Sequence, residues 1–284
     1  MFQRIFGSLS TLILHVVPHR PLARIAWRIT RVRLTPVKNI LIRFFAFLYR
    51  VDMNEAAEPD PRQYPHFNAF FVRALRPGAR PISDDSDDII SPADSVVSAC
   101  GEVRDGNMIQ AKGIAYTAAA LLGDSACAAE FAGGNYATLY LSPRDYHRVH
   151  VPVDGHLRQM RYLPGELFSV NDYSTRHVHG LFARNERLVT VFDTPAGPMA
   201  LVMVGAMFVA AMETTWSGPV DREHPFGHWQ PDGEPVRLAR GEELGRFNMG
   251  STVILLFPAG RTEWTSRLTE GARVQMGETI GRVV

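Results

Sequence analysis

Hydrophobic residues near the N-terminus recur with the spacing of a helix. From Pro21 onward, five apolar residues fall on one helical face while four arginines cover the opposite face. These apolar residues are Leu22, Ile25, Ala26, Ile29 and Val32. A second segment, residues 39–50, places eight bulky apolar residues around Arg43. The pattern predicts two amphipathic helices at the start of the chain.

The rest of the chain has a different pattern of apolar and polar residues. After the polar, proline-containing segment Glu55–Pro65, a short helix is predicted from Phe67 to Leu75, before Pro77-Gly78. From Ile89 onward, short β-prone runs alternate with Gly, Pro, Asn and Asp, which favours antiparallel strands over repeated βαβ units. The predicted strands span residues 136–141, 148–153, 188–192, 199–212 and 252–257. We therefore expect an α+β protein with a mostly antiparallel β core preceded by N-terminal amphipathic helices.

Charge separates the same two regions. Residues 1–51 contain nine Lys or Arg and no Asp or Glu, whereas the remaining chain has a net charge of −8. A basic arm requires an anionic partner, either nucleic acid or a membrane surface. Its bulky apolar residues favour the membrane and argue against nucleic acid, although the helices could instead pack on the body. We predict a membrane-binding region over 1–52 and a catalytic domain over 53–284.

Length and composition indicate where in the cell the protein is expected to reside. With 284 residues, 46% of them hydrophobic, the chain can build a large core. Its longest apolar run, Met199–Met212, has 14 residues and falls short of the ~20 that span a bilayer. No signal peptide is recognisable, and two cysteines, Cys100 and Cys127, favour a reducing compartment. The expected location is the cytoplasmic side of the cell membrane, as a peripheral protein.

Three places could carry chemistry. Asp94 lies in a Ser-Pro-Ala-Asp turn, His147 and His150 lie three residues apart, and Gly250-Ser251-Thr252 directly precedes a buried strand. Each has an ordinary structural explanation. An isolated Asp often forms a turn, two nearby histidines are often one exposed and one buried, and a glycine turn commonly enters a strand. Taken singly, these patterns leave the chemistry open.

Together, in this order, they resemble the phosphatidylserine decarboxylase family, specifically its bacterial pyruvoyl-dependent enzymes. The similar segments are Ser91–Asp94, Tyr146–His150, Pro164–Asn171, Leu181–Arg187 and Gly250–Thr252, together with Val51–Pro59 and Phe70–Leu75 nearer the N-terminus. Two positions depart from the family's pattern. Met249 stands where many members have Leu, and Ser95 stands where Gly often follows the Asp. Neither departure removes a reacting atom.

The resemblance implies a proenzyme that cuts itself. The Ser251 hydroxyl attacks the Gly250 carbonyl to form an ester, and elimination then separates a beta chain, 1–250, from an alpha chain, 251–284. Ammonia is released, and Ser251 becomes a pyruvoyl group at the new terminus. The family pattern assigns Ser251 as nucleophile, His150 as base and Asp94 as the carboxylate that orients the base, which is the logic of a Ser-His-Asp triad. The two cleaved chains are expected to remain together as a heterodimer.

The implied reaction converts phosphatidylserine into phosphatidylethanolamine and carbon dioxide. The pyruvoyl carbonyl forms a Schiff base with the serine amine and accepts the electrons that decarboxylation releases. His147 is our candidate for the proton donor, because imidazole ordinarily titrates near the working pH. An anionic phospholipid membrane is the expected partner of the basic arm. The sequence assigns no residue to the lipid phosphate or to the serine carboxylate.

Two other functions stay open from the residues alone. A metal-dependent hydrolase could use the pairs His147/His150 and His177/His179 as ligands. A noncatalytic membrane adaptor would use the arm alone, with Gly-Ser-Thr as a simple turn. Both alternatives predict an intact chain, and the first also predicts bound metal.

Overall fold

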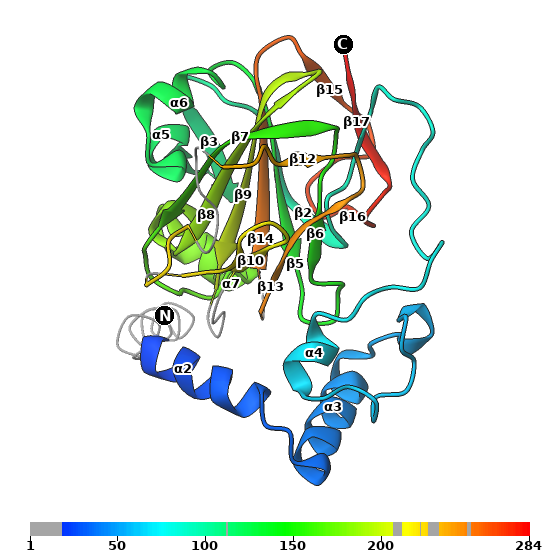
Figure 1. Ribbon diagram of the computed structural model, residues 1–284. Coiled ribbons are helices and arrows are strands. Elements are labelled where there is room, and N and C mark those ends of the chain that lie inside the picture. The colour runs from blue at the N-terminus through cyan, green and yellow to red at the C-terminus, as the bar shows by residue number, and fades with distance from the viewer. Residues whose placement is uncertain (1–18, 112, 207–211, 222, 227–232, 249–250) are drawn as a thin grey trace.

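The computed structural model describes residues 19–111, 113–206, 212–221, 223–226, 233–248 and 251–284. A body of β-sheets lies above a small group of N-terminal helices (Figure 1). All ladders between the labelled strands in the described chain are antiparallel. The predicted α+β class with a mostly antiparallel core is therefore confirmed.

The largest sheet has eight strands in the order β12-β7-β8-β9-β14-β5-β2-β16. Their bounds in that order are Arg237–Leu238, Gly155–Leu163, Arg187–Thr194, Gly197–Gly205, Ser251–Phe257, Asn135–Leu141, Ser95–Glu102 and Arg273–Val274. Strand β14 follows the predicted cleavage position and pairs along its length with β5 and β9. It is therefore an interior strand with hydrogen-bonded neighbours on both sides.

Three smaller sheets complete the body. One has the order β11-β10-β13-β6, with bounds Gly218–Val220, Met212–Thr214, Glu243–Phe247 and Arg148–His150. Another joins β1, β17 and β15, with bounds Asp88–Ile90, Thr279–Val283 and Thr262–Trp264. The hairpin of β3 and β4 spans Asn107–Ala111 and Ile114–Thr117. The β6 strand carries His150 and so makes the four-stranded sheet part of the site.

The eight-stranded sheet is buried on both faces. Along β14, Val253 and Leu255 pack into one apolar cluster and Ile254 and Leu256 into the other, as the alternation of a strand requires. The four-stranded sheet closes the first face. The second is covered by β3, β4 and the short helices α5 (Ala118–Leu122), α6 (Ser125–Ala129) and α8 (Leu181–Arg184). Helix α7 spans Asp172–His177.

The N-terminal helices follow the predicted pattern. Helix α2 spans His19–Thr30, and α3 spans Thr35–Tyr49 with a proline in its first turn. The short helix η1 spans Met53–Glu55, and α4 spans Phe67–Phe71. Ile42 of α3 is fully buried in a cluster with the aromatic residues of α4. In Figure 1, α4 accordingly lies between α3 and the β body.

Several element boundaries differ from the predictions, including those of α4, β9 and β6. Helix α4 ends four residues early, because the Val72 carbonyl accepts from Arg148 and Leu75 forms a bridge with Ala56. The run 199–212 is not one strand: β9 ends at Gly205, residues 207–211 lie outside the described chain, and Met212 begins β10 in another sheet. Strand β6 stops at His150, shortly before Pro152. Among the described helices, none is long and apolar enough to cross a bilayer.

Candidate active site

The predicted site residues gather around the start of β14. The Ser251 backbone pairs with Leu141 of β5 on one side and with Gly205 of β9 on the other. Gly250 and the Ser251 side chain lie outside the described part of the structure. The chain continues from β5 into a loop that leads to His147, whose carbonyl accepts from Phe247 N at 3.1 Å. Segments on both sides of the predicted cleavage position therefore adjoin this loop.

His150 is a buried histidine with both ring nitrogens occupied. Its Nδ1 lies 2.8 Å from the Gly241 carbonyl oxygen, and its Nε2 lies 3.0 Å from the Tyr146 hydroxyl. A carbonyl can only accept, so Nδ1 carries the proton and the Nε2 lone pair accepts from Tyr146. Gly241 adopts φ +84°, a backbone conformation that favours glycine. Burial lowers the pKa of His150, which keeps the ring neutral and able to act as a base.

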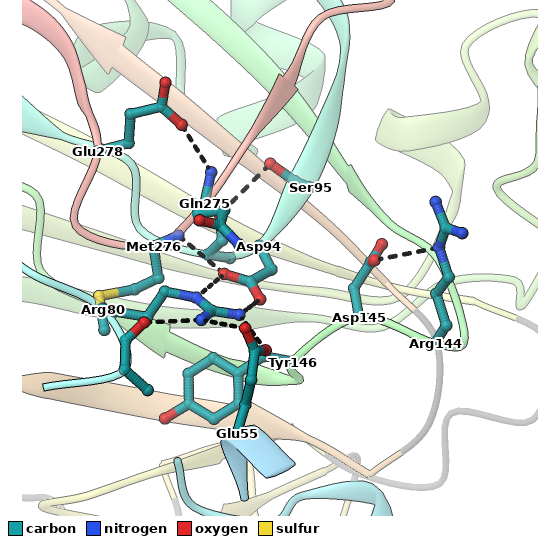
Figure 2. A network of polar contacts seen from close by, with 12 residues as sticks. Glu55, Arg80, Asp94, Ser95, Arg144, Asp145, Tyr146, Gln275, Met276 and Glu278 are labelled. Atoms are coloured by element: carbon teal, nitrogen blue, oxygen red, sulfur yellow. Dashed lines mark hydrogen bonds and ion pairs between the residues drawn. The ribbon is translucent and has the colours of Figure 1, made fainter. Parts of the chain in front are cut away.

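Asp94 is held by an arginine and a backbone amide (Figure 2). Arg80 donates from Nε at 2.9 Å and from Nη2 at 2.6 Å, and Met276 N donates at 2.9 Å. The same guanidinium donates to Glu55 from Nη1 at 3.0 Å and from Nη2 at 2.8 Å. Its hydrogen bonds to Asp94 raise the pKa of Arg80 further above its usual range. Two carboxylates therefore share one cation, and the group has a net charge of −1.

The structure brings Asp94 and His150 into one region without joining their side chains. The backbone N–H of His150 donates to the carbonyl of Pro92 at 2.8 Å, and Pro92 lies in the turn that bears Asp94. No hydrogen bond joins the two described side chains. His150 Nδ1 donates to the Gly241 carbonyl, and the Asp94 carboxylate accepts from Arg80. Asp94 acts on His150 through its charge, which contributes to raising the pKa of the ring against the larger effect of burial.

His147 is fully buried and has one open nitrogen. Its Nδ1 lies 2.8 Å from the Asp145 carbonyl oxygen, while its buried Nε2 has no hydrogen-bond partner. The ring packs on Phe71 of α4 with 4.0 Å between centroids. Burial lowers the pKa of His147 to about 3. The expectation that this imidazole titrates near the working pH is therefore wrong for the described site, where the ring is neutral.

The loop that presents His147 is fixed by its own acidic residue. One carboxylate oxygen of Asp145 accepts from Ser142 N at 2.8 Å and from Ser142 Oγ at 2.6 Å. Arg144 pairs with the other oxygen at 3.7 Å, as Figure 2 also shows. Burial raises the pKa of Asp145, against the effect of these hydrogen bonds. The turn is thereby closed where β5 ends, which positions the two histidines that follow.

The segment containing α4 covers the site from the N-terminal side. Asn68 Nδ2 donates to Asn248 Oδ1 at 2.8 Å, just before the undescribed residues 249–250. Phe71 contacts His147, and the Val72 carbonyl accepts from Arg148 Nε at 3.0 Å. The N-terminal region therefore contacts both the histidine loop and Asn248, which lies shortly before the predicted cleavage position.

The other histidine pair lies elsewhere and offers no metal centre. His177 ends α7, where its Nδ1 lies 2.7 Å from the Tyr173 carbonyl oxygen and its ring stacks on Tyr173. His177 and His179 are exposed, unlike His147 and His150. Among the residues that the structure describes, no three His, Cys, Asp or Glu side chains form a cluster able to hold a metal ion. The ligand set of the hydrolase alternative is not assembled there.

Several residues of the candidate site were not predicted from the sequence. Arg80, Gly241 and Asn68 contact their partners only through the tertiary fold, and nothing in the local sequence marks them. Tyr146 had a signal, since it belongs to the motif that contains both histidines. Glu55 likewise lies within a segment that carries the family resemblance.

These residues form a cluster of buried histidines and charged side chains beside an interior strand. A family model described as phosphatidylserine decarboxylase matches residues 67–282, and a second, described as PSD, matches residues 9–50. Phosphatidylserine decarboxylase proenzymes of three bacteria are similar to nearly the whole chain. That of Nitrosococcus oceani is 48% identical over 99% of this chain and 94% of its own. That of Azotobacter vinelandii is 50% identical over 94% and 96%, and that of Ectopseudomonas mendocina is 48% identical over 99% of both chains. The chain belongs to the phosphatidylserine decarboxylase family.

Proposed function

We propose that this protein converts phosphatidylserine into phosphatidylethanolamine and carbon dioxide after cutting itself between Gly250 and Ser251. The observation that carries the proposal is the identity of about half of all residues with proenzymes named for this activity, over nearly the full length of the chain. The arrangement of His147 and His150 around the strand that begins at Ser251 supplies the acid–base groups that such chemistry needs.

In maturation, His150 is the proposed base for the Ser251 hydroxyl. Its Nε2 has the lone pair, and burial keeps that nitrogen unprotonated at neutral pH. Because the Tyr146 hydroxyl occupies Nε2, Tyr146 must either move aside or pass the proton along its own O–H. Asp94 then acts through its charge. The net negative charge that it forms with Glu55 and Arg80 favours the imidazolium that proton transfer creates.

We propose that the residues around position 251 accommodate a pyruvoyl group. One buried polar atom of the adjoining histidine loop, His147 Nε2, lacks a hydrogen-bond partner. It is therefore our candidate for contacting a carbonyl-bearing group at position 251. The pyruvoyl group, once formed from Ser251, supplies the electron sink that an amino-acid decarboxylation requires.

His147 is the proposed proton carrier in turnover. Its neutral Nε2 can accept a proton from the ammonium of phosphatidylserine, which must be deprotonated before the nitrogen can act as a nucleophile. The same Nε2–H then returns a proton to Cα after carbon dioxide leaves. A substrate anion beside the ring raises its pKa toward the neutral range, which makes both transfers accessible.

The N-terminal helices are the proposed membrane-binding surface. On α3, one face packs through Ile42 onto α4, while five apolar side chains project from the opposite face. These exposed residues are Val37, Ile40, Phe44, Phe47 and Leu48, and their spacing is helical. Arg43 is exposed on the same helix, and the exposed Arg50 follows directly after it. Apolar residues beside basic ones suit the headgroup region of an anionic bilayer.

This surface would bring the site to its lipid. A phospholipid leaves the bilayer at a cost of roughly 0.8 kcal/mol for every buried CH₂, so the enzyme gains by binding at the membrane. Helix α4 contacts α3 through the cluster around Ile42 and contacts His147 through Phe71. The proposed location is therefore the cytoplasmic face of the cell membrane, with the two cleaved chains held together by the pairing of β14 with β5 and β9.

The test combines intact mass spectrometry with an assay of phosphatidylserine decarboxylation. Fresh protein is expected to give two chains, 1–250 and 251–284, the second blocked by pyruvoyl, and to release carbon dioxide from phosphatidylserine in mixed micelles. Ser251→Ala should remain one chain and be inactive. Full-length protein that decarboxylates without being cut would overturn the proposal. So would a cut chain that leaves phosphatidylserine unchanged.

A further inference from the structure

Arg73 is a buried arginine whose donors are mostly unused. It follows α4 and is only 5% exposed. Its Nη2 makes a long hydrogen bond, 3.4 Å, to the Arg144 carbonyl oxygen. Its Nε is buried without an acceptor. The Phe70 ring lies 5.5 Å from the guanidinium carbon, which provides contact with a π face and no hydrogen bond.

The other well-buried arginines of the described chain are satisfied. Arg80 donates to two carboxylates. Arg187 donates to three backbone carbonyl oxygens at 2.6, 2.9 and 2.7 Å. Arg73 has neither arrangement, and no described carboxylate lies within ion-pair distance of it. Burial accordingly lowers the pKa of Arg73, although an arginine stays charged at neutral pH.

A buried cation without a counterion is unfavourable unless an anion joins it. The neighbouring groups do not supply one. The Tyr64 and Tyr146 hydroxyls are neutral at physiological pH, since burial raises the pKa of each. Asp94 and Glu55 act on Arg73 at a distance while their own oxygens are bound to Arg80. The guanidinium is therefore incompletely neutralised by the protein.

Arg73 lies between the lipid-facing helices and the histidine loop. Phe71, two residues earlier, packs against His147, and Arg73 itself contacts the loop at Arg144. Its positive charge also contributes to the lowered pKa of His147. On the other side, Val72 belongs to the cluster that α3 and α4 share. A lipid headgroup that reaches His147 from the α3 side would pass this guanidinium.

We propose that Arg73 binds the phosphodiester group of the phospholipid substrate, an inference that rests on the proposed function. The guanidinium has several N–H donors free for the non-bridging oxygens, a geometry that arginine offers and lysine does not. The substrate's other anion is a poorer partner. The carboxylate leaves as neutral carbon dioxide, so a cation bound to it would stabilise the ground state more than the transition state. The phosphodiester keeps its charge throughout the reaction.

The experiment uses matured protein and two probes. Short-chain phosphatidylethanol carries a phosphodiester but neither amine nor carboxylate, whereas O-hexanoyl serine carries the amine and carboxylate without phosphate. Arg73→Met should raise KM for phosphatidylserine and weaken inhibition by phosphatidylethanol about 10- to 100-fold. It should change kcat and inhibition by O-hexanoyl serine much less. Arg73→Lys should fall between, because it keeps the charge and loses the planar fork. The exposed Arg76→Met is the matched control and should behave as wild type.

Each outcome decides the proposal. Undiminished inhibition of Arg73→Met by phosphatidylethanol would overturn it, and a loss confined to O-hexanoyl serine would assign Arg73 to the carboxylate instead. If Arg73→Met fails to mature, Arg73→Lys provides the comparison, and equal inhibition of Arg73→Lys and wild type would overturn the proposal. Failure of the proposed function is recognised separately, because wild-type protein would then release no carbon dioxide.

Discussion

Arg80 contacts both carboxylate oxygens of Asp94, with Nε 2.9 Å from one oxygen and Nη2 2.6 Å from the other. Its remaining donors reach Glu55, at the end of the N-terminal region. The arginine side chain is 5% exposed, so water offers little alternative solvation. One guanidinium therefore joins the segment that follows the N-terminal helices to the turn that carries the predicted triad carboxylate.

Replacing this cation should slow maturation. Arg80→Gln leaves the carboxylates of Asp94 and Glu55 close together without a counterion, so the two like charges repel each other. Breaking a fully buried ion pair lowers the free energy of unfolding by about 3–5 kcal/mol. Because Glu55 is partly exposed, we expect Arg80→Gln to lower it by about 1–3 kcal/mol. The rate of self-cleavage, followed on denaturing gels after synthesis in vitro, should fall with it.

The control for Arg80→Gln is a pair on the surface. Arg104 lies 3.1 Å from Glu102 with both side chains exposed, so Arg104→Gln should change stability by less than about 1 kcal/mol and leave cleavage unchanged. Normal cleavage and stability in Arg80→Gln would show that the Asp94 carboxylate needs no positioning by this arginine.

Much of the fold could be predicted from local patterns. Period-3.6 spacing indicated α2 and α3, and runs of β-prone residues indicated β5, β8 and β14 to within a few residues. The strand predictions held because each of these strands buries its own apolar pattern, whereas the spacing predicted α2 and α3 although residues such as Ile25 and Phe47 stay exposed. The run 199–212 failed because hydrophobicity is continuous there while the chain changes sheets. The strand order, with β14 placed between β9 and β5, depends on long-range pairing that no local pattern specifies.

The sequence named candidate site residues but not the contacts that the structure gives them. His147, His150 and Asp94 do lie near the strand that begins at Ser251. The resemblance implies that Asp94 orients His150, but the His150 ring donates to the Gly241 carbonyl, which lies 91 positions away along the chain. The pKa of His147 depends on Phe71 and other packing that excludes water. Such effects of burial follow from the tertiary structure alone.

The two histidines should separate maturation from turnover. His150→Ala and Asp94→Asn should leave the chain uncut, because the Ser251 hydroxyl loses its base or the charge that supports it. His147→Ala should mature to two chains and then decarboxylate about 10²- to 10⁴-fold more slowly, as expected for the loss of a proton-transfer group. Gels and carbon dioxide release on the same preparations measure both steps.

His177→Ala is the matched control for these variants, since His177 is exposed on α7 and should affect neither step. An uncut His147→Ala together with a normally matured His150→Ala would reverse the two assignments. Loss of both steps in His147→Ala, with a lowered unfolding temperature, would assign His147 a structural role in the loop.

The apolar face of α3 should control binding to lipid. Phe44→Gln with Phe47→Gln changes two exposed side chains and spares Ile42, whereas deleting residues 1–50 would also remove the contact with α4. Burying one phenylalanine contributes about 1.5–3 kcal/mol, so partial insertion of two predicts at least a tenfold weaker affinity for anionic vesicles. Self-cleavage should be unchanged.

Sedimentation with vesicles of phosphatidylglycerol and phosphatidylcholine measures this affinity. Ile109→Gln is the control, because Ile109 is an exposed apolar residue on β3 of the body. Binding should also weaken as salt screens the basic residues. Equal sedimentation of the double variant and wild type would mean that α3 does not enter the membrane.

The buried neutral state of His147 should appear as a dependence of stability on pH. Its pKa is about 3 in the folded protein and near 6.5 in an unfolded chain, so below pH 6.5 the unfolded state binds a proton that the folded state does not. The stability linked to this group is therefore fully present above pH 6.5 and is lost as the pH falls toward 3. Within that window His147 should contribute a slope of about 1.4 kcal/mol per pH unit to the free energy of unfolding.

Urea unfolding of the uncut Ser251→Ala chain between pH 7.5 and 4.5 measures the total slope. His147→Gln in the same background should be less sensitive to acid by that amount, because the other titrating groups are unchanged. Parallel curves for the two chains would mean that His147 is hydrated and titrates normally in the folded protein.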